Sequence, residues 1–232
     1  MKVLFAGPSL HGQDADLTGL DLRPPARQGD IHRAVLAGAD AIGLIDGVFG
    51  FVPSVWHKEI LFALSQGVRV LGGASLGALR AAECASFGME PVGEIANAYL
   101  SGARHEDADV CLAHAPAELD FMPLSEPLVD VEASVAALLE LGHVTDAEAW
   151  RWLEAAHDLY FADRTVEAML ERAGLAAALA ETYRRHRVGV KARDALALVE
   201  RLRALPAGRG APPEGWSFRA SDPWRNYLAT LA

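Results

Sequence analysis

Short apolar runs alternate with helical periodicity through the first half of the chain. A short apolar run closed by Gly, Pro or Asp is typical of a buried strand, and apolar residues every three or four positions are typical of a helix. We therefore expect strands at 3–6, 20–22, 41–45 and 68–71, and helices at 30–37, 55–65 and 76–87. Gly38, Gly67 and Gly88 follow the three helices, and Ser54 is the expected N-cap of the second. This alternation predicts an α/β fold with a mostly parallel sheet flanked by helices.

The pattern changes after Pro127, where helical periodicity continues without strand-like alternation. The expected helices there are 128–141, 146–160, 165–173, 175–186 and 190–205. A weaker strand is expected just before this change, at 109–113. We divide the chain into an α/β core (1–120), an all-helical region that forms a subdomain or a cap on the sheet (121–205), and a Gly/Pro linker with an aromatic tail (206–232). The tail, from residue 216, is expected to pack back on the body.

Composition narrows the class of protein. Half of the 232 residues are hydrophobic (51%), which predicts a packed globule, and the net charge is −10. An acidic chain lacks the basic face that general nucleic-acid or anionic-membrane binding requires, so we expect neither partner.

Cysteine usage indicates a reducing compartment. Cys84 and Cys111 are the two cysteines, and neither stands in a metal-binding spacing. The amino-terminal apolar run is too short for a signal peptide, and no stretch reaches the ~18 apolar residues of a spanning helix. We expect a cytoplasmic protein without cofactor or metal.

The sharpest motif is Gly73-Ala74-Ser75-Leu76-Gly77, between an expected strand and an expected helix. Gly-x-Ser-x-Gly in that context resembles a nucleophile elbow, in which small residues allow the tight turn that presents the serine. The helix N-terminus that follows offers free N–H groups to an oxyanion or a carboxylate. Ser75 is therefore the expected nucleophile.

Two phosphate-binding glycine motifs do not fit this segment. A dinucleotide fingerprint requires glycine where Ala74 stands, and a P-loop requires Lys followed by Ser or Thr after Gly77, where Ala78 and Leu79 stand. A purely structural role, in which small residues let strand and helix pack closely, stays open.

A serine nucleophile needs a base, and His57 lies near the start of the preceding helix, on the same edge of the sheet. Lys58 is the alternative base if burial lowers its pKa. Asp46 or Glu59 is expected to orient the base, although Glu59 also suits a helix N-terminus for structural reasons. Histidine before serine is the reverse of the order in α/β-hydrolases, which argues against an ordinary esterase.

The expected substrate-binding residues surround the same edge: Ser9, Lys58, Glu59, Gly73, Leu76 and Arg80. Arg80 and Glu83 are three residues apart on an apolar helix, a spacing that favours an internal ion pair over an anion site. Cys84 is interpreted as core filling. The basic residues between Arg184 and Arg193 indicate a solvated face or a docking patch for an acidic partner. Trp150 and Trp152 are expected on different sides of one helix.

Several short motifs of the chain, taken together, resemble the TfuA-like family. The resemblance rests on GGASLGALRAAE at 72–83, IDGVF at 45–49, VWHKEIL at 55–61, PLSEP at 123–127 and FADRT at 161–165, and it covers most of residues 1–195. The family pattern at the turn is Gly-Ala-Ser-Ser-Met-Gly, so Gly73, Ala74 and Leu76 replace the alanine, the first serine and the methionine. Ser75 matches the second serine.

The resemblance implies a partner of a YcaO enzyme, which uses ATP in backbone thioamidation of ribosomally made precursor peptides. It further implies release of sulfur from a small thiocarboxylated carrier protein, a form of acyl transfer. Two alternatives remain: a non-catalytic module that recruits or activates its partner by binding a carboxylate terminus or a peptide, and a stand-alone serine hydrolase or esterase.

Overall fold

The computed structural model describes residues 1–50 and 52–229. Within these residues five strands form one parallel sheet in the order β2–β1–β3–β4–β5. Their bounds are β1 Lys2–Phe5, β2 Leu20–Arg23, β3 Ala41–Leu44, β4 Arg69–Gly73 and β5 Glu90–Val92. The expected α/β class and the first four expected strands are confirmed.

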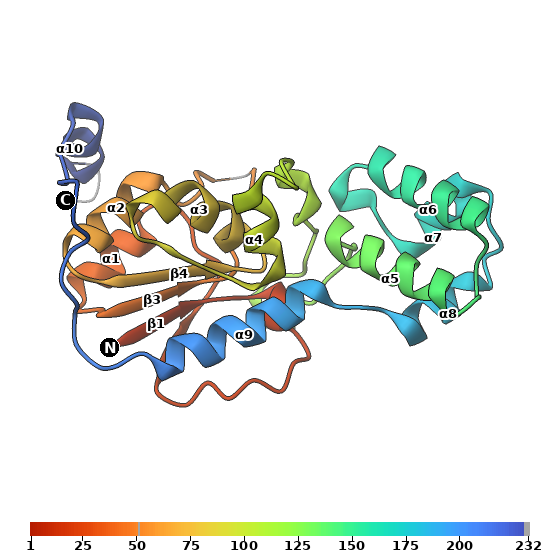
Figure 1. The fold of residues 1–232 in the computed structure, drawn as a ribbon, viewed down its shortest axis with the longest axis horizontal. Helices are drawn as coiled ribbons and strands as arrows, with labels where there is room; N and C mark the ends of the chain where they lie inside the picture. Colours follow the sequence, from red (N-terminus) through yellow and green to blue (C-terminus); the bar gives the residue numbers. More distant parts are fainter. Residues whose placement is uncertain (51, 230–232) are drawn as a thin grey trace.

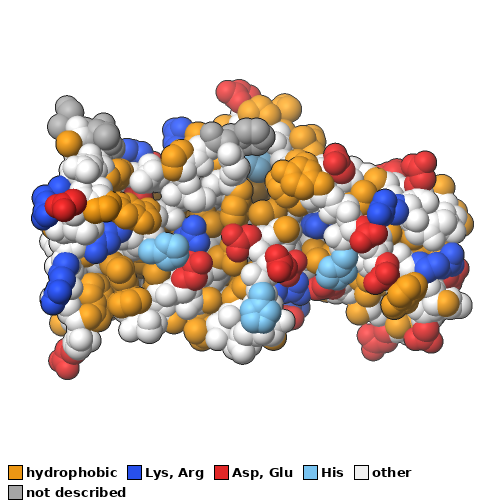
Figure 2. Space-filling model, turned by 90° about the horizontal axis from the view of Figure 1, so that it is seen from above, with side chains coloured by type: hydrophobic (Ala, Val, Ile, Leu, Met, Phe, Trp, Pro, Cys, Tyr) orange, Lys and Arg blue, Asp and Glu red, His pale blue; other side chains and the backbone are white. Residues whose placement is uncertain are grey.

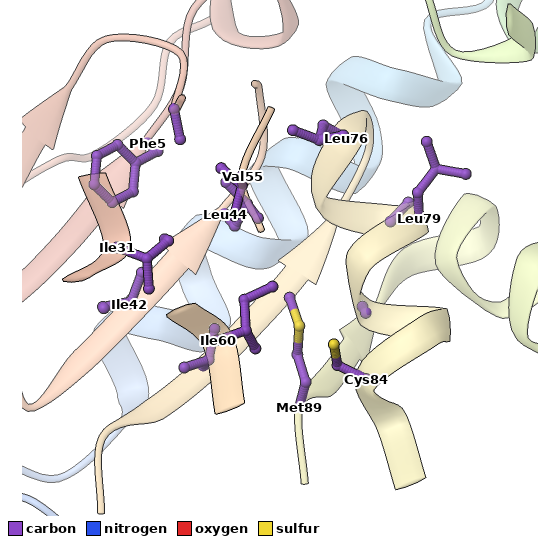
Figure 3. Packing of buried hydrophobic residues seen from close by; sticks show 14 of the residues in the cluster. Phe5, Ile31, Ile42, Leu44, Val55, Ile60, Leu76, Leu79, Cys84 and Met89 are labelled. Atoms are coloured by element: carbon purple, nitrogen blue, oxygen red, sulfur yellow. The ribbon is translucent and has the colours of Figure 1, made fainter. Parts of the chain in front are cut away.

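The period-two alternation of buried strands decides which side chains face which layer. In β1, Val3 and Phe5 join the apolar cluster on one face of the sheet, whereas Leu4 joins the cluster on the other. Figure 3 shows Ile42 and Leu44 of β3 packed in the first of these clusters with side chains from the covering helices. Both faces of the sheet are therefore dry, as parallel sheets require.

Helices cover the two faces unequally. The first face is covered by α1 Asp30–Leu36, α2 His57–Ser65 and α3 Leu76–Cys84, and the second by α9 Val190–Ala204 (Figure 1). Gly43 permits the approach of α9, because a Cβ there would lie 2.8 Å from a methyl group of Leu198. Although α9 falls within the predicted helical region 121–205, it packs on the sheet. The division into domains stays a prediction.

Two local expectations were wrong, and the first concerns a strand. Residues 109–113 form no strand; a 3₁₀ turn, Asp107–Asp109, and irregular backbone occupy this segment. The fifth strand is β5, which contains Pro91 and is followed by α4 Gly93–Ser101. Proline is tolerated there because β5 is an edge strand, with no neighbour on its outer side among the described residues.

The second concerns Ser54, which is not the N-cap of α2. Its hydroxyl donates to the carbonyl of Val48 at 2.9 Å, and the helix begins two residues later than expected, with Trp56 as N-cap. The carboxylate of Glu59 accepts the Trp56 N–H and so closes the first turn. The Ser54 hydroxyl is therefore used in a hydrogen bond within the preceding loop, although the local sequence predicts that it caps the helix.

The helices α5–α8 form a second lobe with its own core, beyond the carboxyl ends of the strands (Figure 1). Their bounds are α5 Leu128–Glu140, α6 Asp146–Asp158, α7 Val166–Ala173 and α8 Leu179–His186. Trp152 is fully buried and stacks on Tyr183 with ring centroids 5.5 Å apart, while Trp150 is 63% exposed. The expected helical character and the opposite orientation of the two tryptophans are confirmed.

The arginines near α8 form ion pairs within the chain, and a docking patch for an acidic partner stays a prediction. They pair with separate carboxylates: Arg184 with Glu167, Arg185 with Glu181, Arg187 with Glu126 and Asp130, and Arg193 with Glu94. On the face seen in Figure 2, blue side chains likewise lie among red ones. Lys191 is buried.

The linker and tail are held against the body, as expected for the described part of 216–232; the last three residues lie outside the described range. Arg69 donates to the carbonyls of Pro206 and Gly208, and Gly210 N–H donates to Gly67. Helix α10, Asp222–Ala229, buries Trp224 in an aromatic cluster with Phe62 of α2 and other rings. Among residues 1–50 and 52–229, no helix is long and apolar enough to cross a membrane.

Candidate functional site

Three turns meet at the carboxyl edge of the sheet, at the ends of β1, β3 and β4. Because β2 lies beyond β1 and β3 follows β1 on its other side, the strand order reverses direction here. In open α/β sheets such a switch point is where ligands bind. The three turns carry Ser9, Asp46 and Ser75, so the structure brings together the three loops that the sequence placed on one edge.

Asp46 joins the first two turns. One of its oxygens accepts the N–H groups of Gly7 at 2.9 Å and Ser9 at 3.0 Å, and the other accepts the Ser9 hydroxyl at 2.7 Å. The residue is 2% exposed, so a carboxylate is buried at the cost of desolvation and is held by three donors. Asp46 therefore fixes the loop after β1 beside the end of β3, and its hydrogen bonds do not go to His57.

Replacement of Asp46 by alanine is expected to lower the free energy of unfolding by about 3 kcal/mol, because it leaves buried donors of Gly7 and Ser9 without acceptors. Asp46→Asn keeps one carbonyl oxygen and should lose less. Urea unfolding followed by circular dichroism measures both values. Equal stability of Asp46→Ala and the parent protein would show that water replaces the carboxylate at no cost.

The turn at Ser75 is tight. Ala74 has a φ of +63°, a left-handed conformation that is unusual for a residue other than glycine, and Ser75 N–H donates to the Gly73 carbonyl at 2.7 Å. Ser75 itself has a φ of −123° and stands as N-cap of α3, although its side chain caps no helix N–H. The backbone strain of the turn therefore falls on the residue before the serine.

The glycines of the motif let α3 lie directly on the sheet. A Cβ on Gly77 would come within 1.7 Å of the Leu44 carbonyl oxygen, and one on Gly72 would come within 2.2 Å of the Gly77 carbonyl oxygen. Gly73 is similarly close to Val92, at 2.5 Å. Close packing thus accounts for these glycines, so their presence is no evidence for a function of Ser75.

One backbone donor remains at the start of α3. Gly77 N–H donates to Ile45 and Ala78 N–H to Ser75, both across the turn. In the described part of the chain no acceptor is found for the N–H of Leu76, whose side chain is buried beside Gly47. The N–H after the nucleophile is the donor that an oxyanion hole of the elbow type uses.

A cavity of about 390 Å³ opens beside Ser75. Its lining comes from the carboxyl edge of the sheet, from the segment that follows α4, from the start of α9 and from the helical lobe. The lining residues are Pro8, Pro25, Asp46, Gly47, Val48, Phe49, Ser75, Val110, Cys111, Leu112, Ala113, His114, Tyr160, Phe161, Ala162 and Lys191. Ser75 is 5% exposed and lines this cavity.

Two of the motifs that carry the family resemblance hold the wall of this cavity. The Ser125 hydroxyl accepts the N–H of Ala113 at 2.8 Å, which fixes the segment before it. Arg164 is buried and donates to the carbonyl of Ala156 at 2.9 Å, and its own carbonyl accepts the Glu126 N–H at 2.8 Å. PLSEP and FADRT therefore tie the 110–114 segment of the cavity wall to the helical lobe.

Four titratable side chains of the lining were not predicted from the sequence as site residues, namely Cys111, His114, Tyr160 and Lys191. His114 Nδ1 lies 2.8 Å from the carbonyl oxygen of Ala115, which can only accept, so Nδ1 is the donor, and no hydrogen-bond partner of Nε2 is found among the described residues. Burial lowers the pKa of Lys191, and the carboxylates of Asp46 and Asp130 oppose that shift. Burial raises the pKa of the Cys111 thiol to about 11, so it is no thiolate at neutral pH.

Lys191 left a readable signal that reasoning from the sequence missed. It stands seven positions before Leu198 and four before Ala195, on the apolar stripe with which α9 faces the sheet. A lysine on such a stripe has to be buried. His114 left no comparable signal, because the irregular segment around it has no periodicity.

His57 lies elsewhere. It lines a separate, open cavity with Trp56 and Arg80, and its Nε2 lies 2.7 Å from a carboxylate oxygen of Glu83. No hydrogen bond between His57 and Ser75 occurs among the described residues. The Lys58 ammonium lies over the ring of Phe218, 4.8 Å from its centroid, also outside the Ser75 cavity.

Glu59 and Arg80 make structural contacts, as the sequence analysis allowed for both residues. Glu59 is fully buried and accepts the N–H groups of Gly29 and His32, which ties α1 to α2. Arg80 donates to the Val55 carbonyl and pairs with Glu83 at 2.7 Å, so the expected ion pair forms, but Glu83 is exposed and the pair is not internal. Cys84 is buried in the core, as expected.

A family model described as TfuA-like protein matches residues 46–165, slightly more than half of the chain. The match begins at Asp46 and includes Ser75, the 110–114 segment and Phe161, but it ends before Lys191. No curated protein matches the chain.

Proposed function

Because the chain belongs to the TfuA-like family, whose members are partners of YcaO enzymes in peptide thioamidation, we propose that it supplies the sulfur by hydrolysing a thiocarboxylated carrier protein at Ser75. The YcaO enzyme then uses that sulfur, with ATP, on the backbone of a precursor peptide. One observation carries the proposal: Ser75 lines a partly enclosed cavity at the switch point of the sheet, beside the N–H of Leu76, for which the described residues provide no acceptor.

The reaction requires a nucleophile, a donor for the oxyanion and a place for one proton. The Ser75 oxygen attacks the acyl carbon, the C–S bond breaks, and sulfide leaves as HS⁻ with the serine proton. Water then cleaves the Ser75 ester, which returns the hydroxyl and leaves the carrier as a carboxylate with one released proton. The Leu76 N–H would stabilise the negative oxygen in both steps.

We propose His114 as the base in place of His57. His114 and Ser75 line the same cavity, and the hydrogen bond of Nδ1 to the Ala115 carbonyl leaves Nε2 free to accept a proton. His57 is engaged by Glu83 and lines a different cavity. Asp46, bonded to Ser9, supports the loop beside the site rather than the base.

One observation favours the non-catalytic alternative, a recruitment module. In an elbow the strained position presents the nucleophile, but here the residue with φ of +63° is Ala74, which carries no nucleophile. If the site only binds a carrier or peptide terminus, substitutions in the cavity should weaken association with the YcaO enzyme. Hydrolysis of simple activated esters by the purified protein alone would instead favour a stand-alone esterase.

The direct test combines purified protein with a thiocarboxylated carrier and no YcaO enzyme, and measures free sulfide and the mass of the carrier. We expect one sulfide for each carrier that changes from thiocarboxylate to carboxylate. Sulfide formation that needs the YcaO enzyme but leaves this protein dispensable would overturn the proposal.

A further inference from the structure

Lys191 is a buried lysine in the lining of the Ser75 cavity. It lies in the first turn of α9 and is 3% exposed, and it lines both the 390 Å³ cavity and a small neighbouring one of about 50 Å³. Among the described residues, it is the only lysine or arginine in the lining of the larger cavity.

The ammonium of Lys191 has more donors than the protein uses. Its Nζ donates to the Val110 carbonyl at 2.7 Å, and no carboxylate oxygen lies within 4.0 Å of it in the part of the chain that is described. An ammonium has three N–H groups, so two are left. A buried charge without a counterion is costly, and the cavity is the space from which a counterion can come.

The neighbouring carboxylates are occupied by other donors. Asp130 accepts the backbone N–H of Lys191 at 3.0 Å and pairs with Arg187, and Asp46 is bonded to the loop that carries Ser9. Both are close enough to favour the charged form of Lys191, against the burial that lowers its pKa. An anion bound in the cavity would form an ion pair with Lys191 Nζ, which neither Asp46 nor Asp130 forms.

We propose that Lys191 binds the anionic end of the ligand, a carboxylate or thiocarboxylate at the terminus of an extended chain. The identity of that ligand, a carrier terminus, rests on the proposed function. Its negative charge does not, because it is inferred from Lys191 alone. Most of the other lining residues are small or apolar, including Pro8, Val48 and Ala162, which fits a neutral chain behind a single negative group. The one carboxylate of the lining, Asp46, is held by its own three donors. The terminus would then lie in the same cavity as the Ser75 hydroxyl.

The test uses two probes that differ only in charge: N-acetyl-trialanine with a free carboxylate and the same peptide as its amide, titrated by calorimetry at neutral pH. The parent protein is expected to bind the acid about tenfold more tightly or better. Lys191→Met should reduce this preference to about twofold or less. Arg193→Met, an exposed cation two residues along α9 that pairs with Glu94, serves as the matched control and should keep it.

Equal affinity of the parent protein for acid and amide, or no binding of either, would overturn the proposal. So would a folded Lys191→Met variant that keeps the full preference. If Lys191→Met does not fold, Ala162→Trp tests the proposal by filling the cavity while Lys191 is kept. Undiminished binding of the acid by Ala162→Trp would also overturn the proposal.

The outcomes also separate this inference from the proposed function. A protein that prefers the acid but releases no sulfide keeps the anion site and loses the hydrolytic role. A Lys191→Met variant that releases sulfide at the parent rate, at carrier concentrations below saturation, keeps hydrolysis and loses the anion site.

Discussion

Replacement of Ser75 by alanine is expected to reduce sulfide release from a thiocarboxylated carrier by about 10³-fold or more, because the attacking oxygen is lost. The fold should survive, since the Ser75 side chain caps no helix N–H and accepts no hydrogen bond from the described residues. Sulfide release in single-turnover conditions, with the carrier in excess of its dissociation constant, measures the chemical step alone.

Three measurements make the Ser75 result decisive. Association of Ser75→Ala with the YcaO enzyme should equal that of the parent protein, because the hydroxyl lies inside a cavity. Ser101→Ala, on the exposed end of α4, should release sulfide at the parent rate. A folded Ser75→Ala protein that still supports full thioamidation would leave the recruitment module as the surviving function.

Replacement of Gly77 by alanine is expected to give the largest loss of stability among single substitutions at the turn, about 3–5 kcal/mol. The added Cβ would meet the Leu44 carbonyl oxygen at 1.7 Å and its carbon at 2.6 Å, both backbone atoms of β3 that cannot rotate away. The better helix propensity of alanine returns only about 1 kcal/mol. Urea unfolding of the purified variant measures the loss.

The control for Gly77 is Gly210→Ala, in the linker. The nearest atom to a Cβ there is Nε of Arg69 at 3.8 Å, an ordinary contact, so its stability should change by less than about 1 kcal/mol. Parent-like stability of Gly77→Ala would mean that α3 can lift from the sheet without loss. In that case the glycines of the motif would need a functional rather than a packing role.

The glycines and the serine of the motif have separate roles. Gly72, Gly73 and Gly77 are explained by backbone distances between α3, β3, β4 and β5, whatever Ser75 does. A Gly-x-Ser-x-Gly pattern therefore establishes a tight strand–turn–helix junction. The function depends on what the turn faces, which is the cavity beside the helical lobe.

Local sequence was sufficient for most elements because their signals are local. Apolar runs in 3–6 and 41–45 form β1 and β3, and helical periodicity in the second half gives α5–α9 within a few residues. It failed at β5, because Pro91 and a length of three residues give no strand signal, and only pairing with β4 makes that segment a strand. It failed at Ser54 for a related reason, since the competing acceptor, Val48, lies in the loop.

By itself, the sequence determined the α/β class, the turn at Ser75 and its place on one edge with Ser9 and Asp46, since the carboxyl ends of parallel strands share an edge. Only the tertiary structure decided which side chains surround Ser75. His57, nearer in sequence, is held by Glu83, while His114 and Lys191 reach the cavity from segments 39 and 116 positions away. The physical reason is that a cavity forms where several elements, far apart in the sequence, leave space between them. A local sequence pattern contains no information on which distant side chains will line that space.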